Sequence, residues 1–128
     1  MAQRQRIILV AEDNVLINAL LYEILREEGY QVISCFTGEE VFRVIQQVVP
    51  DVVLLDMQLE TRDAGSIVLM KMRAMPETMH ISTIIVSADP YMVSTNRLVI
   101  TACHAEMLLK PFDVSELLDK TQRFRTRP

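Results

Sequence analysis

The sequence predicts a three-layer α/β domain in which helices cover both faces of a doubly wound, five-stranded parallel sheet. Two observations lead to this prediction. Short apolar runs without alternation recur along the chain, as is typical of strands buried on both faces. Helical periodicity separates each run from the next, as expected for repeated βα units. The predicted strands are 7–11, 31–36, 52–55, 82–87 and 105–109.

The first two helices have clear start and stop signals. After the first strand, six apolar residues recur at helical spacing: Leu16, Ile17, Leu20, Leu21, Ile24 and Leu25. Asn14 is suited to cap the start of this helix, and Gly29 to end it. The sequence 37–40 (TGEE) forms a capping box for the second helix, which Pro50 would end. Its inward face would hold Val41, Phe42, Val44, Ile45 and Val48.

The second half of the chain continues the pattern. We expect a polar loop over 58–65 and a short helix over 67–75, ended by Pro76. Pro90 would open a helix that runs to about Ala102. The sequence 113–116 (DVSE) resembles another capping box, and it would start a last helix with Leu117 and Leu118 facing inward.

Composition limits the class of protein. A chain of 128 residues fits one domain, 1–128, and its 50% hydrophobic content argues against disorder. The net charge of −4 argues against general nucleic-acid binding. No apolar run is long enough for a membrane helix, and the first residues lack a signal-peptide pattern. These features favour a cytoplasmic protein. The basic tail, about 120–128, is interpreted as a solvated helix end.

Polar residues lie at, or directly after, the ends of four of the predicted strands. Glu12 and Asp13 follow the first, Asp56 the third, Ser87 ends the fourth, and Lys110 follows the fifth. In a parallel sheet these positions share one edge, where ligands bind. A carboxylate can attack phosphorus, and a hard cation such as Mg²⁺, a lysine and a hydroxyl can neutralise or bind the phosphoryl oxygens. Singly, each residue has an ordinary structural interpretation as a helix cap or surface charge. Together they predict a phosphoryl-accepting magnesium site.

Four stretches resemble the receiver domain of two-component response regulators, a resemblance that covers nearly the whole chain. They are 8–14 (ILVAEDN), 51–56 (DVVLLD), 84–88 (IIVSA) and 109–112 (LKPF). The resemblance implies the flavodoxin-like (βα)5 fold. It also implies a phosphoacceptor that is not an enzyme in its own right and receives phosphate from a sensor histidine kinase or a histidine phosphotransfer protein.

The resemblance also implies roles for individual residues. Asp56 would be the phosphoacceptor. Mg²⁺ would be bound by Asp56, by Asp13 directly, by Glu12 through water, and by the backbone carbonyl of Gln58.

Two further residues would bind the phosphoryl group. Ser87 takes the place of the switch Ser or Thr. Lys110 takes the place of the lysine that precedes a proline, and the Lys110–Pro111 peptide is usually cis in the family.

Two positions depart from the family pattern. Met107 stands where the family usually has Tyr or Phe, three residues before the lysine. A flexible methionine would fill that cavity without the usual two-position rotamer switch of the aromatic ring. Tyr91 is the candidate to take over from the missing ring. Glu60 occupies the usual proline position, four residues after Asp56.

The expected protein is a stand-alone receiver that signals to a separate, unknown downstream protein or passes phosphate on. A homodimer or partner surface is expected on the fourth helix, fifth strand and fifth helix, with Tyr91, Met92, Leu98, Met107 and residues near Phe124.

Two alternatives remain open. One is a hydrolase with an aspartyl-phosphate intermediate, of the haloacid dehalogenase type, although Gln58 stands where that type needs a second acid. The other is a pseudo-receiver that binds partners without phosphorylation, which the Met107 substitution keeps open.

Overall fold

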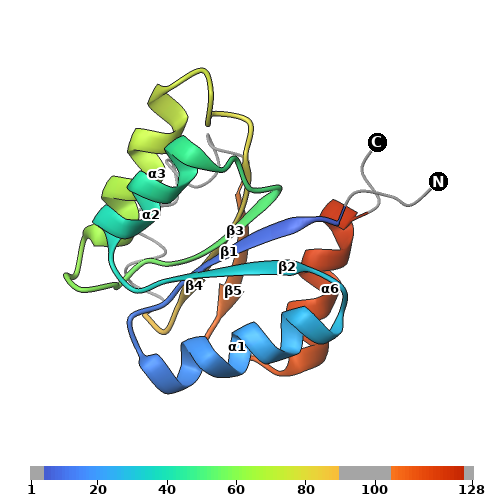
Figure 1. The fold of residues 1–128 in the computed structure, drawn as a ribbon. Coiled ribbons are helices and arrows are strands. Elements are labelled where there is room, and N and C mark those ends of the chain that lie inside the picture. Colours follow the sequence, from blue (N-terminus) through green and yellow to red (C-terminus); the bar gives the residue numbers. More distant parts are fainter. Residues whose placement is uncertain (1–4, 90–104, 126–128) are drawn as a thin grey trace.

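The chain folds around a five-stranded parallel sheet with the strand order β2-β1-β3-β4-β5 (Figure 1). This computed structural model describes residues 5–89 and 105–125. The strands are β1 (Ile7–Ala11), β2 (Gln31–Cys35), β3 (Val52–Asp56), β4 (Ser82–Ser87) and β5 (Glu106–Leu109). All four neighbouring pairs are parallel. The order is that of the flavodoxin-like fold, so the predicted fold class is confirmed.

Helices cover both faces of the sheet. They are α1 (Val15–Glu27), α2 (Gly38–Gln47), α3 (Ala64–Ala74) and α6 (Val114–Arg125). Helices α1 and α6 lie on one face, and α2 and α3 on the other (Figure 1). None of the helices in the described ranges is long and apolar enough to cross a bilayer. The helix predicted from Pro90 lies outside the described residues, as do Tyr91, Met92, Leu98 and the side chain of Phe124.

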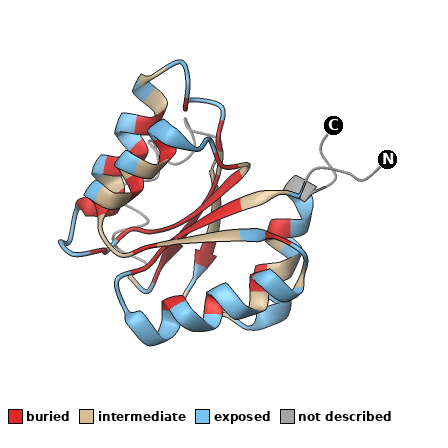
Figure 2. Cartoon of the chain, in the orientation of Figure 1, coloured by how far each residue is buried: buried red, intermediate tan, exposed pale blue. Residues whose placement is uncertain are grey.

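Alternation along the strands divides the core into two parts. The α2–α3 core joins Leu9, Ala11, Val53, Leu55 and Ile85 of the sheet to Val41, Ile45, Val68, Leu69 and Met72 of the helices. The α1–α6 core joins Ile8, Val10, Leu54, Ile84 and Val86 to Leu21, Leu25 and Leu117. Neighbouring residues on a strand point to opposite faces, so each strand supplies both cores. Figure 2 shows the central strands mostly buried, the edge strands β2 and β5 with residues of intermediate burial, and the outer helix faces exposed.

The local helix-start signals are confirmed. The side chain of Asn14 accepts a hydrogen bond from the Ile17 amide at 3.0 Å and caps α1. The Thr37 hydroxyl accepts one from the Glu40 amide at 3.1 Å and caps α2. The Glu40 carboxylate in turn binds the amide of Phe36, one residue before the cap, at 2.6 Å. The bonds from the Ile17 and Glu40 amides satisfy donors that the first helical turn leaves unpaired, and the bond from Phe36 holds the residue before the cap.

The last helix also begins with a capping box. The Asp113 carboxylate accepts from the Glu116 amide at 2.9 Å, and Glu116 accepts from the Asp113 amide at 3.4 Å. Leu117 is fully buried and Leu118 is partly buried, as predicted.

At the C-terminal end of α1, Gly29 has a φ of 96°, a left-handed conformation that favours glycine where a helix ends.

The predicted start of the third helix is wrong by three residues, because α3 begins at Ala64 and not at residue 67. No capping bond comes from the side chain of Asp63, so the local signal is missing. The start is instead set by a tertiary contact in which the Gly65 amide donates to the carbonyl of Met57 at 3.1 Å. Smaller corrections are that α2 ends at Gln47, ahead of the exposed Val48, and that β2 and β5 are each one residue shorter than predicted.

The apolar residues that predicted α1 do not all face the sheet. Leu21 and Leu25 are buried, whereas Leu16 and Leu20 are 82% and 60% exposed. The apolar stripe is wider than the surface that the sheet covers. Part of α1 therefore leaves an apolar surface uncovered in the described structure.

Gly65 is required by close packing. A Cβ at this position would lie 2.4 Å from the Cα of Met57 and 2.5 Å from the carbonyl oxygen of Asp56. We expect Gly65→Ala to destabilise the fold by about 2 kcal/mol, because the backbone must move. Urea unfolding measures this loss. The control is Gly38→Ala, whose Cβ would meet the movable side chain of Val68 at 3.1 Å. Equal stability of Gly65→Ala and wild type would contradict the packing argument.

Candidate functional site

The strand register brings the predicted polar residues to one edge of the sheet. Asp56, the last residue of β3, pairs with Val86, and Ser87, the last residue of β4, pairs with Leu109. Glu12 follows β1 directly, and Lys110 follows β5 directly. Parallel strands end at the same side, so residues distant in sequence meet there.

Lys110 joins two of the acidic residues. Its Nζ lies 2.7 Å from Oε1 of Glu12 and 2.8 Å from Oδ2 of Asp56. Both carboxylates are buried, with 3% and 6% of their residue surface exposed. Buried carboxylates need a cation or several hydrogen-bond donors, and Lys110 supplies the cation. The Lys110–Pro111 peptide is cis, as the resemblance implies.

The pKa of the Lys110 ammonium is raised above its ordinary value. Its burial favours the neutral amine, but the hydrogen bonds and negative charges of Asp56 and Glu12 outweigh that effect. Lys110 therefore stays charged at neutral pH.

Asp13 completes an acidic cluster with the other two acids. Each of Glu12, Asp13 and Asp56 offers a carboxylate oxygen, and these oxygens lie within 4.8 Å of one another. The pKa of the Asp13 carboxyl is raised, first by partial desolvation and then by the hydrogen bond and negative charge of Glu12. Three hard oxygen donors at this spacing suit a divalent cation such as Mg²⁺, which would also relieve their mutual repulsion.

Backbone amides orient the carboxylates. The Gln58 amide donates to Oδ1 of Asp56 at 2.9 Å. The Asn14 amide donates to Oε2 of Glu12 at 3.2 Å. Each buried acid thus uses one oxygen for Lys110 and the other for a backbone donor, which fixes its rotation.

Ser87 lies at the same edge, but the hydrogen bonds of its hydroxyl go to Asp89 and not to Asp56. The hydroxyl accepts a hydrogen bond from the Asp89 amide at 3.1 Å and donates to the Asp89 carbonyl at 3.3 Å. Its carbonyl accepts from the Lys110 amide at 2.8 Å, which ties the ends of β4 and β5 together. In this structure the Ser87 hydroxyl therefore stabilises the turn from Ser87 to Asp89.

Met107 lies on β5 opposite Ile85. It is partly buried and packs against the α2–α3 core. A methionine fills this position with a flexible apolar side chain. It has no hydroxyl that would need a new hydrogen-bond partner if the side chain moved.

Asn18 is a residue of the site that the sequence prediction missed. It is buried, and its side-chain NH₂ donates to the carbonyls of Glu12 and Cys35 at 2.9 and 3.0 Å. It therefore joins α1 to the ends of β1 and β2. The signal was present, because Asn18 shares one helical face with the buried Leu21 and Leu25, where a polar residue needs a partner.

The fold and this edge define a phosphoryl-accepting signalling domain, and the sequence agrees. Residues 8–122 match the family model of the response regulator receiver domain. The chain belongs to the receiver domain family of two-component response regulators.

Two bacterial proteins illustrate the similarity. The chain is 27% identical over 117 residues to sporulation initiation phosphotransferase F of Bacillus subtilis, with 91% of each chain covered. It is 38% identical over 111 residues to the transcriptional regulatory protein YbdJ of the same organism. That match covers 87% of this chain and 47% of YbdJ, so the chain spans about half the length of that relative.

The chain is also similar to a solved structure. The receiver domain of the sensor histidine kinase PA1611 from Pseudomonas aeruginosa is 25% identical, with a TM-score of 0.80. The match covers 94% of this chain and 98% of that one. The PA1611 domain was solved with a magnesium ion coordinated in its active-site cleft.

Asn18→Ala tests the support beneath the acidic cluster. Two hydrogen bonds to backbone carbonyls are lost, but the amide oxygen of Asn18 is itself buried without a partner among the described residues. We expect a net destabilisation of about 1–2 kcal/mol in urea unfolding. A larger loss than for the exposed capping variant Asn14→Ala supports a buried bridging role, and no loss contradicts it.

Proposed function

We propose that Asp56 accepts a phosphoryl group from a phosphohistidine on a sensor kinase or phosphotransfer protein. The observation that supports this best is the Lys110 ammonium between Asp56 and Glu12, beside a third carboxylate. Such an arrangement offers a nucleophile together with positive charge for the incoming phosphoryl oxygens.

The transfer exchanges one bond to phosphorus for another. A carboxylate oxygen of Asp56 forms a P–O bond as the P–N bond of the phosphohistidine breaks, and the electron pair of that bond stays on the imidazole nitrogen. Lys110 pairs with a phosphoryl oxygen after transfer. The Asp56 carboxylate loses its negative charge when it is phosphorylated and no longer needs Lys110 as a counter-ion. The Lys110 ammonium can then form an ion pair with the phosphoryl oxygen.

Glu12, Asp13 and Asp56 would hold Mg²⁺, with the backbone carbonyl of Gln58 as a further ligand. The ion, when bound, neutralises charge between the carboxylates and the phosphoryl group. The spacing of the three carboxylate oxygens supports this assignment.

Signalling would use the loop that begins at Ser87. The Ser87 hydroxyl is satisfied by Asp89 in the present state. A phosphoryl oxygen on Asp56 would compete for this hydroxyl and release the loop. With Met107 in place of an aromatic ring, the change would be transmitted mainly by this loop to a separate downstream protein.

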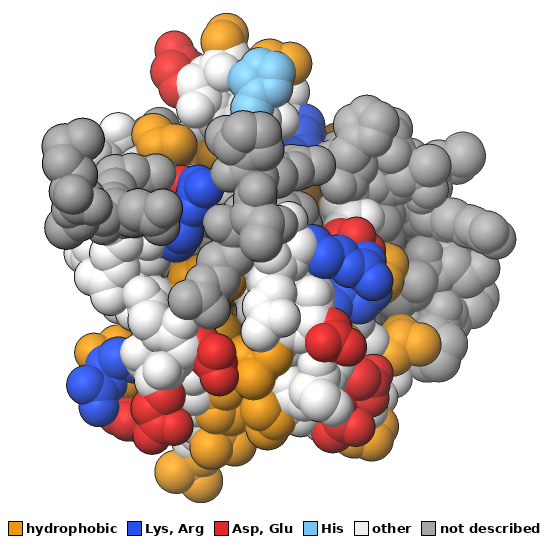
Figure 3. Space-filling view, turned by 90° about the vertical axis from the view of Figure 1, so that its right-hand side faces the viewer, with side chains coloured by type: hydrophobic (Ala, Val, Ile, Leu, Met, Phe, Trp, Pro, Cys, Tyr) orange, Lys and Arg blue, Asp and Glu red, His pale blue; other side chains and the backbone are white. Residues whose placement is uncertain are grey.

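The phosphodonor protein would dock on the uncovered apolar surface of α1. A groove of about 400 Å³ runs beside Lys110 and is lined by Ile17, Leu20, Leu21, Ile24, Ala88, Pro111, Phe112, Val114 and Leu117. Figure 3 faces the end of the sheet where the strands begin, and in it hydrophobic side chains gather toward the bottom, where α1 and α6 lie, with acidic side chains on both sides. A donor must cover the rim of the site to bring its histidine to Asp56, and on the α1 side this rim is apolar.

Asp56→Asn tests the phosphoacceptor. Incubation of the wild type with acetyl phosphate and Mg²⁺ should add the mass of one phosphoryl group, measured on the intact protein, and the variant should gain none. The exposed Asp119→Asn is the control and should gain the group at the wild-type rate. Phosphorylation of Asp56→Asn at that rate would refute the assignment.

Calorimetric titration with Mg²⁺ tests the metal ligands. We expect Asp13→Ala to weaken binding by about tenfold or more, and Glu12→Ala by less. The reason is that the Glu12 carboxylate is already engaged by Lys110 and the Asn14 amide, whereas Asp13 is exposed. Equal affinity in all three proteins would refute the metal site.

The docking surface predicts a difference between two phosphodonors. With a phosphotransfer domain selected for its ability to phosphorylate the wild type, Leu20→Gln, which changes an exposed residue of the groove, should slow transfer by about fivefold or more. Acetyl phosphate needs no docking surface, so its reaction should be unaffected. Met70→Gln is the control, an exposed apolar residue on α3 across the sheet. Equal slowing by both variants would contradict docking on α1.

A further inference from the structure

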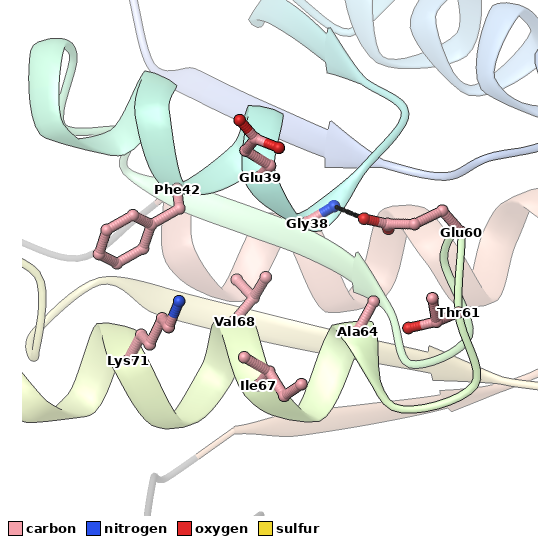
Figure 4. A pocket seen from close by; sticks show the side chains of 9 residues that line it. All are labelled: Gly38, Glu39, Phe42, Glu60, Thr61, Ala64, Ile67, Val68 and Lys71. Carbon is pink, nitrogen blue, oxygen red and sulfur yellow. Dashed lines mark hydrogen bonds between the residues drawn. The ribbon is translucent and has the colours of Figure 1, made fainter.

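The loop that follows the phosphoacceptor is held against a neighbouring helix by Glu60. The Glu60 carboxylate accepts a hydrogen bond from the backbone amide of Gly38, with N–O distances of 2.9 and 3.1 Å (Figure 4). Gly38 is the first residue of α2, where the amide has no partner within the helix. The bond is charge-assisted and lies at the positive end of the helix dipole.

This contact is not a general attraction between opposite charges. The first turn of α2 already carries Glu39 and Glu40, so a third carboxylate is brought there against repulsion. Lys71, a cation that lines the same pocket, lies over the ring of Phe42 at 5.0 Å from its centroid. Figure 4 shows Glu60 reaching to the Gly38 nitrogen while Glu39 points away from it. The geometry of one hydrogen bond therefore holds Glu60 in place.

The rest of the loop is fixed near the sheet, and Glu60 fixes its outer part. The Gln58 amide is bound to Asp56, and Leu59 is buried in the α2–α3 core. The Gly65 amide is bound to Met57. Between Leu59 and the start of α3 the loop is exposed, and Glu60 connects this exposed part to α2.

We propose that Glu60 is a positioning residue for the metal site. The contacts of Gln58 and Leu59 fix the chain on either side of the Gln58 carbonyl, and the Glu60 contact, one residue further on, limits rotation of the peptide that carries this carbonyl before Mg²⁺ binds. This inference rests on the proposed function, in which Gln58 is a metal ligand. Without the contact, Mg²⁺ binding would have to restrict this peptide itself, and that entropic cost would lower the affinity.

Magnesium titration by calorimetry tests the positioning role. We expect Glu60→Ala to bind Mg²⁺ about three- to tenfold more weakly than the wild type. Glu60→Gln keeps an acceptor for the Gly38 amide and should recover part of the affinity. The matched control is Glu39→Ala, which removes an exposed carboxylate of the same helix turn and should bind as the wild type does.

The other side of the bond can be removed independently. Gly38→Pro deletes the donor at a helix position that accepts proline, and the extended Thr37 (φ −134°, ψ 159°) suits a following proline. Gly38→Ala keeps the amide and controls for the added Cβ. Gly38→Pro should weaken Mg²⁺ binding as Glu60→Ala does, and the double variant should be no weaker than either one.

Coupling requires a reciprocal effect in the wild type. Saturating Mg²⁺ should slow hydrogen exchange of the Gly38 amide by about the same factor by which Glu60→Ala weakens the ion. A role limited to fold stability would not connect these two measurements.

The outcomes separate the two proposals. If the wild type binds no Mg²⁺, the proposed metal site is wrong and the role of Glu60 is wrong with it. If the wild type binds Mg²⁺ and Glu60→Ala binds it equally well, the metal site stands and the positioning role is refuted. Additive losses in the double variant would also refute it, because they would show that the two residues act separately.

Discussion

The site depends on one cation, the Lys110 ammonium, which forms ion pairs with two buried carboxylates. Lys110 follows β5, which is an outermost strand of the sheet. Its ammonium nevertheless binds one acid that follows β1 and another that ends β3. The side chain must therefore extend past β4, which a long, flexible lysine can do. Because a buried carboxylate without a partner is strongly destabilising, the ends of these strands must be aligned for the fold to be stable. The same alignment brings Asp56, the proposed phosphoacceptor, together with Glu12 and Lys110.

Features that depend on local sequence were predictable. The strand β4 has the predicted bounds, and Asn14, Thr37 and Asp113 start their helices as expected. In each case a side chain bonds to an amide a few residues away, so the pattern is visible in a short stretch. The gathering of acids and a lysine at one edge also followed from the sequence, because parallel strands share their carboxyl ends.

Features that depend on contacts between distant segments were not predictable in this way. The start of α3 is set by the approach of Gly65 to Met57, and Asp63 supplies no capping bond. Glu60 was recognised as unusual in the sequence, but its partner Gly38 lies 22 residues earlier. The wide apolar stripe of α1 predicted the helix correctly, but periodicity alone did not say which part the sheet would leave exposed.

The two separate cores affect how the sequence can vary. Side chains of the α2–α3 core and the α1–α6 core are divided by the sheet backbone, so a volume change in one core does not crowd the side chains of the other. A larger residue on α3 can be accommodated by a smaller one on α2 without any change on α1 or α6. The α1–α6 face, where a phosphodonor is proposed to dock, and the α2–α3 face, to which Glu60 is bonded, can therefore diverge at different rates among related chains. A hybrid that exchanges one helical layer is physically reasonable for the same reason.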